Sequence, residues 1–422
     1  MKRVTVSILL AIMSLMLLCS CSDPTPISAE LPDGIITTKN VQYNGWRSII
    51  AGEQYVFSAD GLGIQGTGKI NTVTNRVTEV CLKPNCDHRP VHDPKIEPDY
   101  CRMSSYCDLY FVSGQEIFYS YHVFDTDYDK VDHDESNNTD VIYIFASYNF
   151  TTGESRDILK IKTTDFEQMY KFIHHDGYIY YNRNVAKVER PESKEDYALS
   201  LCRMKIGEYR EEVLFVFENG VDFPDPLAVR GNKVYFTSVT GGKILEIDIE
   251  SKKSRYLLDG SNGVLGFFDS NGVFYIDNHI YFTAISPNYI GTDFERSHLE
   301  LYRVNCTTGE TEKLTEDLVR WIFVADKKIY YEIAPEVSSS EENFSSVRTV
   351  KEMDHDGKNV RSFEMSLSSP DLLVDDVVGA SDCLYFRMKY RIGHSDEFAV
   401  DGFKIAFNLK DGTVTEIGKE ES

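Results

Sequence analysis

Apolar and polar residues alternate over short stretches along most of the chain, and residues 231–258 show the pattern most clearly. Residues 234–236 form an apolar-aromatic run, and residues 244–249 largely alternate apolar with polar side chains. Alternation with a period of two places successive side chains on opposite faces of a strand, and the Gly241-Gly242 pair supplies the positive φ angle of a tight hairpin. The stretch therefore predicts three short strands in succession.

The same apolar-aromatic phrase recurs seven times, usually just after a Gly, Asn, Asp or Lys, with spacings of 46 to 62 residues. Four short strands with their turns need roughly 40 to 50 residues, which is the length of one blade of a β-propeller. Polar, charged stretches at residues 122–140 and 185–197 explain the longer spacings as loop insertions. The phrases are centred on Val56, Phe118, Tyr180, Tyr235, Tyr281, Tyr330 and Tyr385.

A closed ring of sheets suits this repeat physically. One four-stranded sheet cannot bury both of its faces, whereas blades stacked around an axis bury each other's faces. We therefore expect an all-β fold, a single β-propeller of about seven four-stranded blades over residues 33–422, with six or eight blades as alternative counts. A pair of β-sandwiches is the alternative architecture. Only residues 164–170 show a mild helical pattern.

The first 20 residues have the pattern of an export signal. Lys2 and Arg3 precede an apolar run at residues 4–18, which is too short for an ordinary membrane span. The run ends in LCSC, which resembles the bacterial lipobox, a motif whose last cysteine is acylated after cleavage of the signal. The resemblance implies that Cys21 is the lipidated first residue of the mature protein. A plain secretory signal is the alternative, and residues 21–32 have the composition of a lipidated N-terminus with a short tether.

Two further motifs indicate a family. Residues 301–305 (LYRVN) with residues 308–310 (TGE) match a blade phrase, and residues 81–88 (CLKPNCDH) match C-x-x-P-x-C-x-H. Both resemble segments of propeller-type lipoproteins of anaerobic Gram-positive bacteria. The resemblance covers essentially the whole mature chain. It implies a lipid-anchored protein on the extracytoplasmic face of the cell membrane, and it implies no activity.

The cysteines raise a choice between a metal and disulfides. Cys81, Cys86, Cys101 and Cys107 lie within 27 residues, and His88 lies between them. The arrangement C-x4-C-x-H-x12-C offers three thiolates and an imidazole, enough for a structural zinc site of tetrahedral geometry. Export favours oxidation, so disulfides among the four cysteines are an equal alternative, and free thiols are a third. Three other cysteines fall on or near apolar strands and are expected as small buried hydrophobes, namely Cys202, Cys306 and Cys383.

An acidic stretch resembles a calcium loop only in part. Asp125, Asp127 and Asp129 match the first three ligand positions of an EF-hand, but Lys130 replaces the glycine of the sharp turn and Ser136 replaces the bidentate glutamate. A solvated acidic insertion is the better interpretation.

Two other patterns suggest phosphate or sugar binding and have simpler explanations. The glycines of residues 61–68 approach two phosphate-binding motifs, but Ile70 stands where a P-loop needs Ser or Thr and strand-like alternation follows instead of a helix. A flexible hairpin is expected there. Trp46 and Trp321 suit sugar stacking, yet aromatic residues at strand positions are more often part of the blade core.

The net charge of −23 argues against binding nucleic acid or anionic lipid through surface charge. No G-x-S-x-G or H-E-x-x-H motif occurs, and we assign no catalytic residue. The sequence favours a non-enzymatic binding protein for a glycan, peptide or envelope protein. A scaffold acting through protein contacts is the first alternative, and a glycan hydrolase or lyase is the second.

Overall fold

The computed structural model describes most of the second of two compact units, residues 1–35 and 36–422. The described residues are 42–44, 49–51, 54–58, 66–84, 86, 101, 103, 107–124, 141–163, 171–187, 197–217, 224–238, 242–264, 266–267, 272–290, 298–325, 327–334, 345–380, 382–391, 398–399 and 404–417. No helix in these ranges has the length and apolar character needed to cross a membrane. Among them, regular structure other than strands is confined to the 3-10 turn η3 (Pro287–Tyr289).

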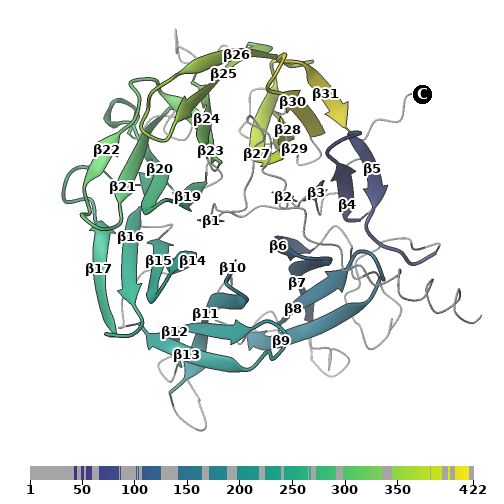
Figure 1. Cartoon of the computed structure of the whole chain (residues 1–422), viewed down its shortest axis with the longest axis vertical. Coiled ribbons are helices and arrows are strands. Elements are labelled where there is room, and N and C mark those ends of the chain that lie inside the picture. Colours follow the sequence, from purple (N-terminus) through teal and green to yellow (C-terminus); the bar gives the residue numbers. More distant parts are fainter. Residues whose placement is uncertain are drawn as a thin grey trace, which may run out of the picture. The chain divides into compact units, whose positions relative to one another are not determined.

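Consecutive strands form seven antiparallel meanders, which we call blades 1 to 7 (Figure 1). Blade 1 contains β2 (Ile49–Ala51), β3 (Tyr55–Ser58), β4 (Gly68–Asn71) and β5 (Arg76–Glu79). Blade 2 contains β6 (Asp108–Ser113), β7 (Glu116–Phe124), β8 (Val141–Asn149) and β9 (Ser155–Thr163). Blade 3 contains β10 (Phe172–His175), β11 (Tyr178–Ala186), β12 (Tyr197–Lys205) and β13 (Glu211–Val216). Blade 4 contains β14 (Pro224–Arg230), β15 (Lys233–Ser238), β16 (Lys243–Asp248) and β17 (Lys253–Leu258).

The last three blades carry small additions to this plan. Blade 5 contains β19 (Val273–Ile276), β20 (His279–Ile285), β21 (Leu299–Asn305) and β22 (Thr311–Lys313), and β18 (Gly266–Phe267) also pairs with β20. Blade 6 contains β23 (Val319–Val324), β24 (Lys328–Ile333), β25 (Val347–Asp354) and β26 (Arg361–Ser366). Blade 7 contains β27 (Leu372–Ala380), β28 (Cys383–Arg391), β30 (Lys404–Asn408) and β31 (Val414–Ile417), and β29 (Phe398–Ala399) pairs with β28.

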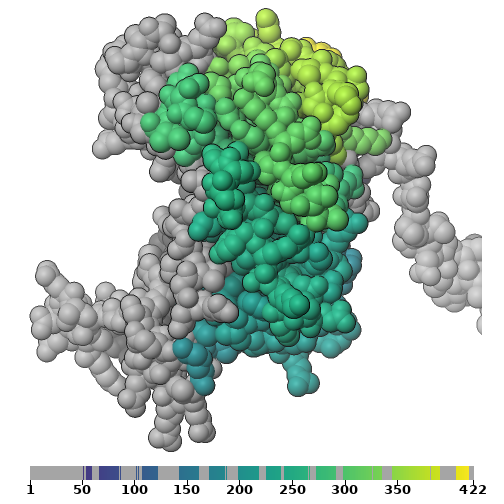
Figure 2. Space-filling model, turned by 90° about the vertical axis from the view of Figure 1, so that its left-hand side faces the viewer, coloured from purple at the N-terminus to yellow at the C-terminus, as the bar shows by residue number. Residues whose placement is uncertain are grey.

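The blades follow one another around a ring. The first strands touch in cyclic order from β2 through β6, β10, β14 and β19, then β23 contacts β20 and β27, and β27 returns to β2. Figure 2 looks onto the side of β17 and β22, where the blades succeed one another in chain order from teal to yellow. The expected single β-propeller is confirmed, with seven blades, and the pair of β-sandwiches is excluded.

Each of the seven predicted phrases is the second strand of a blade, and its side chains are buried except for Tyr55, which is half-buried. In six of the seven phrases two aromatic residues are adjacent, so the period-two pattern puts one into each blade face and neighbouring blades share them. Among the largest fully buried side chains are Tyr119, Tyr181, Tyr235, Tyr281, Tyr331 and Tyr385. The aromatic richness of the sequence therefore supplies the packing between blades.

Turns between third and fourth strands in several blades share one local design. Asn305 Oδ1 accepts the N–H groups of Thr307 (2.8 Å) and Thr308 (3.1 Å), and Gly309 adopts a φ of 77° that suits glycine. Asn149 and Asp248 accept backbone N–H groups in the same way. These side chains replace backbone partners that a tight turn lacks, which explains the recurring Asn or Asp followed by Gly.

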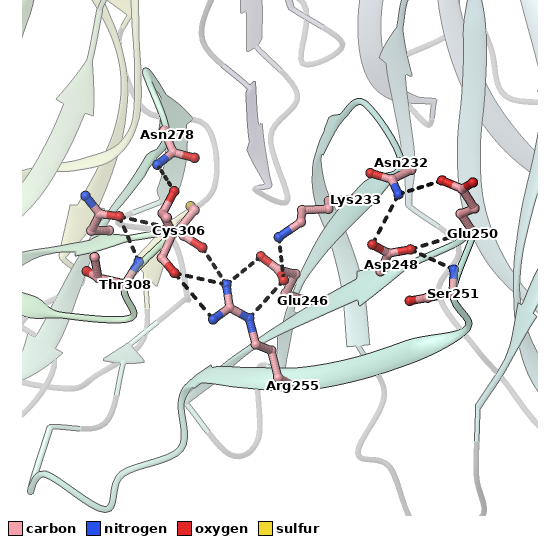
Figure 3. Close-up of polar contacts among 12 residues, drawn as sticks. Asn232, Lys233, Glu246, Asp248, Glu250, Ser251, Arg255, Asn278, Cys306 and Thr308 are labelled. Atoms are coloured by element: carbon pink, nitrogen blue, oxygen red, sulfur yellow. Dashed lines mark hydrogen bonds and ion pairs between the residues drawn. The ribbon is translucent and has the colours of Figure 1, made fainter.

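Arginines connect the same turns to the preceding blade. In Figure 3, Arg255 of blade 4 lies between Glu246 and the carbonyl of Cys306 in blade 5, to which it donates at 2.7 Å. Arg303 of blade 5 donates to the His355 carbonyl of blade 6 at 2.7 Å, and Arg361 of blade 6 reaches blade 7. Blade-to-blade contact is thus polar at the turns and apolar between the sheets.

A short strand near the N-terminal end of the second unit lies inside the ring. β1 (Gln42–Asn44) pairs antiparallel with β19, the first strand of blade 5, and also contacts β14. Figure 1 shows β1 in the middle of the ring. The central space is therefore partly filled by the chain itself.

Ring closure should depend on a hydrogen bond between its first and last blades. Tyr385 of blade 7 donates to Asn75 Oδ1 of blade 1 at 3.0 Å. We expect Tyr385→Phe and Asn75→Gly each to destabilise the protein, with a coupling of about 1 kcal/mol in the double variant. Glycine is chosen because Asn75 has a φ of 53°. Urea unfolding of the four proteins measures the coupling, and strictly additive effects would contradict the prediction.

Candidate functional site

The blade topology divides the connections between two faces of the ring. Connections from first to second and from third to fourth strands lie on one face, which we call the short-turn face, because consecutive strands run in opposite directions. Connections from second to third strands and from blade to blade lie on the opposite, long-loop face. Short-turn connections run from two residues, as at 231–232, to six, at 355–360. The longer connections of the long-loop face include 80–107, 125–140, 187–196, 286–298, 334–346 and 392–403.

Both insertions predicted from the sequence connect second to third strands, so both belong to the long-loop face. β7 ends at Phe124 and β11 ends at Ala186, slightly inside the predicted ranges. Residues 125–140, with the EF-hand-like aspartates, lie outside the described residues. Sequence reasoning found these insertions but not their common face, because that property follows from strand order.

Three of the predicted metal-ligating residues come together between blades 1 and 2. The Sγ atoms of Cys81, Cys86 and Cys101 all lie within 4.8 Å of one another. Cys101 is buried and the other two are half-buried. His88, the fourth predicted ligand, lies outside the described residues. The structure thus brings together side chains from both ends of the 80–107 connection.

The cysteine segment is held against blade 2 by a tyrosine. Tyr148 of β8 accepts the N–H of Leu82 at 3.0 Å and donates to the carbonyl of Val80 at 3.3 Å. Leu82 also lies close to Gly153 in the turn that follows β8. A turn closes inside the segment, where the Cys86 N–H points to the Lys83 carbonyl at 3.4 Å. These contacts fix the direction in which Cys81 enters the cluster.

Cys107, the fourth cysteine of the region, has a different environment. Its Sγ lies 3.5 Å from Thr67 Oγ1, and burial raises the pKa of its thiol to about 12. In the metal-free protein, contact with Cys81 and then burial raise the pKa of Cys101 far above its usual range. The thiols of Cys101 and Cys107 are therefore protonated at neutral pH unless a cation replaces the proton.

The remaining predicted residues are partly accounted for. Cys202 and Cys306 are buried as expected, whereas Cys383 is only half-buried. Trp321 is buried in the blade core, and its Nε1 donates to Glu332 at 2.6 Å, which confirms the core interpretation. The predicted lipid site Cys21, Trp46 and residues 164–170 lie outside the described residues. Residues 68–71 form β4 rather than the helix that a phosphate loop requires.

Sequence reasoning missed two largely buried ion pairs, both near the long-loop ends of blade strands. Lys171 Nζ lies 2.9 Å from Asp225 Oδ2 and connects blades 3 and 4. Glu332 binds Arg348 at 2.9 Å, and Arg348 also donates to the Leu372 carbonyl of blade 7. Buried charges need such partners, and the pairs tie blades together at the rim of the ring. No local pattern distinguishes these residues from solvent-exposed charges.

Comparison with known proteins places the chain among distant structural neighbours. No family model and no curated protein matches it. It is similar to an oligogalacturonate lyase in complex with manganese, at 12% identity over 75% of this chain and 85% of that one, with a TM-score of 0.43. The β-propeller domain of the trilobed protease from Pyrococcus furiosus aligns at 14% identity over 75% and 83%, with a TM-score of 0.44. Acylaminoacyl peptidase from Pyrococcus horikoshii aligns at 12% identity over 82% and 51%, with a TM-score of 0.43. One fold serves many activities, so these likenesses identify none.

Removing the Tyr148 hydroxyl, which bonds to the backbone of the cysteine segment, should make that segment more mobile. We expect Tyr148→Phe to speed hydrogen exchange at the Leu82 amide about fivefold, because a lost hydrogen bond costs about 1 kcal/mol. Mass spectrometry or NMR of the exchanging protein measures this rate. Tyr121→Phe is the control, since Tyr121 bonds to Asp157 within blade 2. Equal rates in all three proteins would show that the Tyr148 hydroxyl does not hold the segment.

Proposed function

We propose that the protein is a lipid-anchored binding protein of the cell surface, which captures a glycan, peptide or envelope protein on its long-loop face. The observation that carries the proposal is the unequal distribution of connections. Short turns cover one face, while the longer connections all emerge on the other. Variable loops on a rigid scaffold are where proteins most often place recognition.

The inner strand favours the long-loop face over the channel as the binding site. Because β1 runs antiparallel to β19, Gln42 lies nearer to the short-turn face than Asn44 does. Within the described residues, β1 thus runs from the short-turn side toward the long-loop side. β1 also takes up space along β14 and β19 that a ligand in the channel would need. Catalysis inside the channel is accordingly the less favoured alternative.

Exposed apolar residues on the two faces provide positions at which substitutions can test the binding face. Ile290 follows η3 in the 286–298 connection and is 64% exposed. The same connection is held in place by the stacking of Tyr289 on buried His298, with ring centroids 4.5 Å apart. Val73, in a turn of the short-turn face, is 79% exposed and provides a matched position on the other side.

The proposed anchor predicts a change of location. Cys21→Ser should release the protein from the membrane fraction into the medium, because stable anchoring needs the acyl chains that this thiol would carry. Cell fractionation and metabolic labelling with an alkyne fatty acid measure the effect. Cys19→Ser, two residues earlier, should keep both label and location. A labelled, membrane-bound Cys21→Ser protein would exclude Cys21 as the anchor.

The binding face is tested by charge substitutions on opposite sides. Ile290→Asp should weaken capture of solubilised envelope material from native cells about tenfold, because desolvating a carboxylate in an apolar contact costs more than 1 kcal/mol. Val73→Asp should leave capture unchanged. The measurement is a cross-linked pull-down with wild-type protein and both variants, in which bound glycans and proteins are quantified separately.

The composition of the captured material separates the three functions. A defined glycan lost in Ile290→Asp supports capture, and a stoichiometric protein lost in the same variant supports the scaffold alternative. Shortened glycan products after incubation support a hydrolase or lyase. Capture that weakens equally in both variants, or only in Val73→Asp, rejects the long-loop face as the site.

A further inference from the structure

We infer that Cys81, Cys86 and Cys101 bind one Zn²⁺ ion, which fixes the connection between blades 1 and 2. The three sulfurs come from both ends of the 80–107 connection and meet within 4.8 Å of one another. Convergence of three thiols is the feature to be explained. It goes beyond the binding function proposed above, because it does not depend on any ligand of the long-loop face.

The geometry suits a metal better than a disulfide. A Zn–S bond is about 2.3 Å long, so two sulfurs on one tetrahedral zinc lie about 3.8 Å apart. Small side-chain adjustments bring sulfurs that are already within 4.8 Å to that spacing. A disulfide, with sulfurs about 2.0 Å apart, joins two of the three and leaves one over. Only a metal uses all three.

The donors also select the kind of metal. Thiolates are soft ligands that favour zinc over calcium, magnesium or manganese, which prefer oxygen. On binding, the three thiols release three protons to solvent and keep both electrons of each S–H bond as thiolate lone pairs, so no oxidant or reductant is needed. A disulfide would require an oxidant to accept two electrons.

The surrounding backbone shows what the metal would stabilise. Thr67 already bridges the two ends of the connection, since its carbonyl accepts the N–H of Val80 at 3.0 Å and its N–H donates to the carbonyl of Met103 at 2.7 Å. The connection 80–107 is the longest between successive strands of the blades. A cross-link at its base removes conformational freedom from the whole loop, at little cost to the blades. The zinc therefore fixes both ends of this connection to the packed side chains between blades 1 and 2.

Metal analysis of the full chain, purified in detergent without added reductant or oxidant, tests the assignment. We expect about one zinc per chain by mass spectrometry of the metal, falling at least tenfold in each of Cys81→Ser, Cys86→Ser and Cys101→Ser. Cys107→Ser is the matched control, because this thiol is buried in the same core and bonds to Thr67 outside the cluster. It should retain the zinc. Replacement by Co²⁺ should give sulfur-to-metal charge-transfer absorption that is lost in the same three variants.

Measurements on the unmodified protein guard against variants that fail to fold. Chelation should remove the zinc, speed hydrogen exchange in the segment around residues 81–84, and be reversed by adding Zn²⁺. The strand signal in circular dichroism should stay unchanged. A zinc-free protein that is lighter by two hydrogens would overturn the inference, because it indicates a disulfide. A zinc-free protein in which all three thiols react with an alkylating reagent would also overturn it. So would zinc that is retained in all three cysteine variants.

Discussion

The ring depends on the junction between its last blade and its first. Blade 1 uses only β2 to β5 and blade 7 only β27 to β31, so no strand is exchanged between the two ends. The chain itself joins the other neighbouring blades, whereas side-chain packing must hold this junction. Val56 and Ile70 of blade 1 belong to the same buried cluster as Leu384 of blade 7, and Tyr385 bonds across to Asn75. If this contact fails, the ring opens and each terminal blade exposes an apolar face.

The repeated turn serves two purposes at once. Its Asn or Asp and its Gly satisfy and shape the local backbone, and its remaining carbonyls accept arginines from the preceding blade. Glu246 shows how such an arginine is held. It is 5% exposed, and although burial alone would raise its pKa, Arg255 and Lys233 lower the pKa below its usual value. The carboxylate therefore stays charged at neutral pH and keeps Arg255 aimed at Cys306.

The fold was largely predictable because its signals are local. Alternation over a few residues defines each second strand, and glycines such as Gly309 mark the turns. The pairing of Gln42 with Tyr275 is not local, and the sequence gives no sign of the inner strand β1. The cysteine cluster could be predicted in part. The spacing of the cysteines predicted a cluster, but only the packed chain separates Cys107, beside Thr67, from the three thiols that meet.

The short-turn face carries contacts between blades, whereas the connections of the long-loop face vary in length. A blade with an even number of strands returns the chain to the same side, so every connection between blades and every link from second to third strand falls on one face. On the other face, the third-to-fourth-strand turns of blades 5, 6 and 7 accept arginines from the preceding blade, and lengthening them would break these contacts. The long-loop face carries no such constraint, and insertions accumulate there at little thermodynamic cost. The thiol cluster lies at the base of the longest of these connections, packed against the buried side chains between blades 1 and 2.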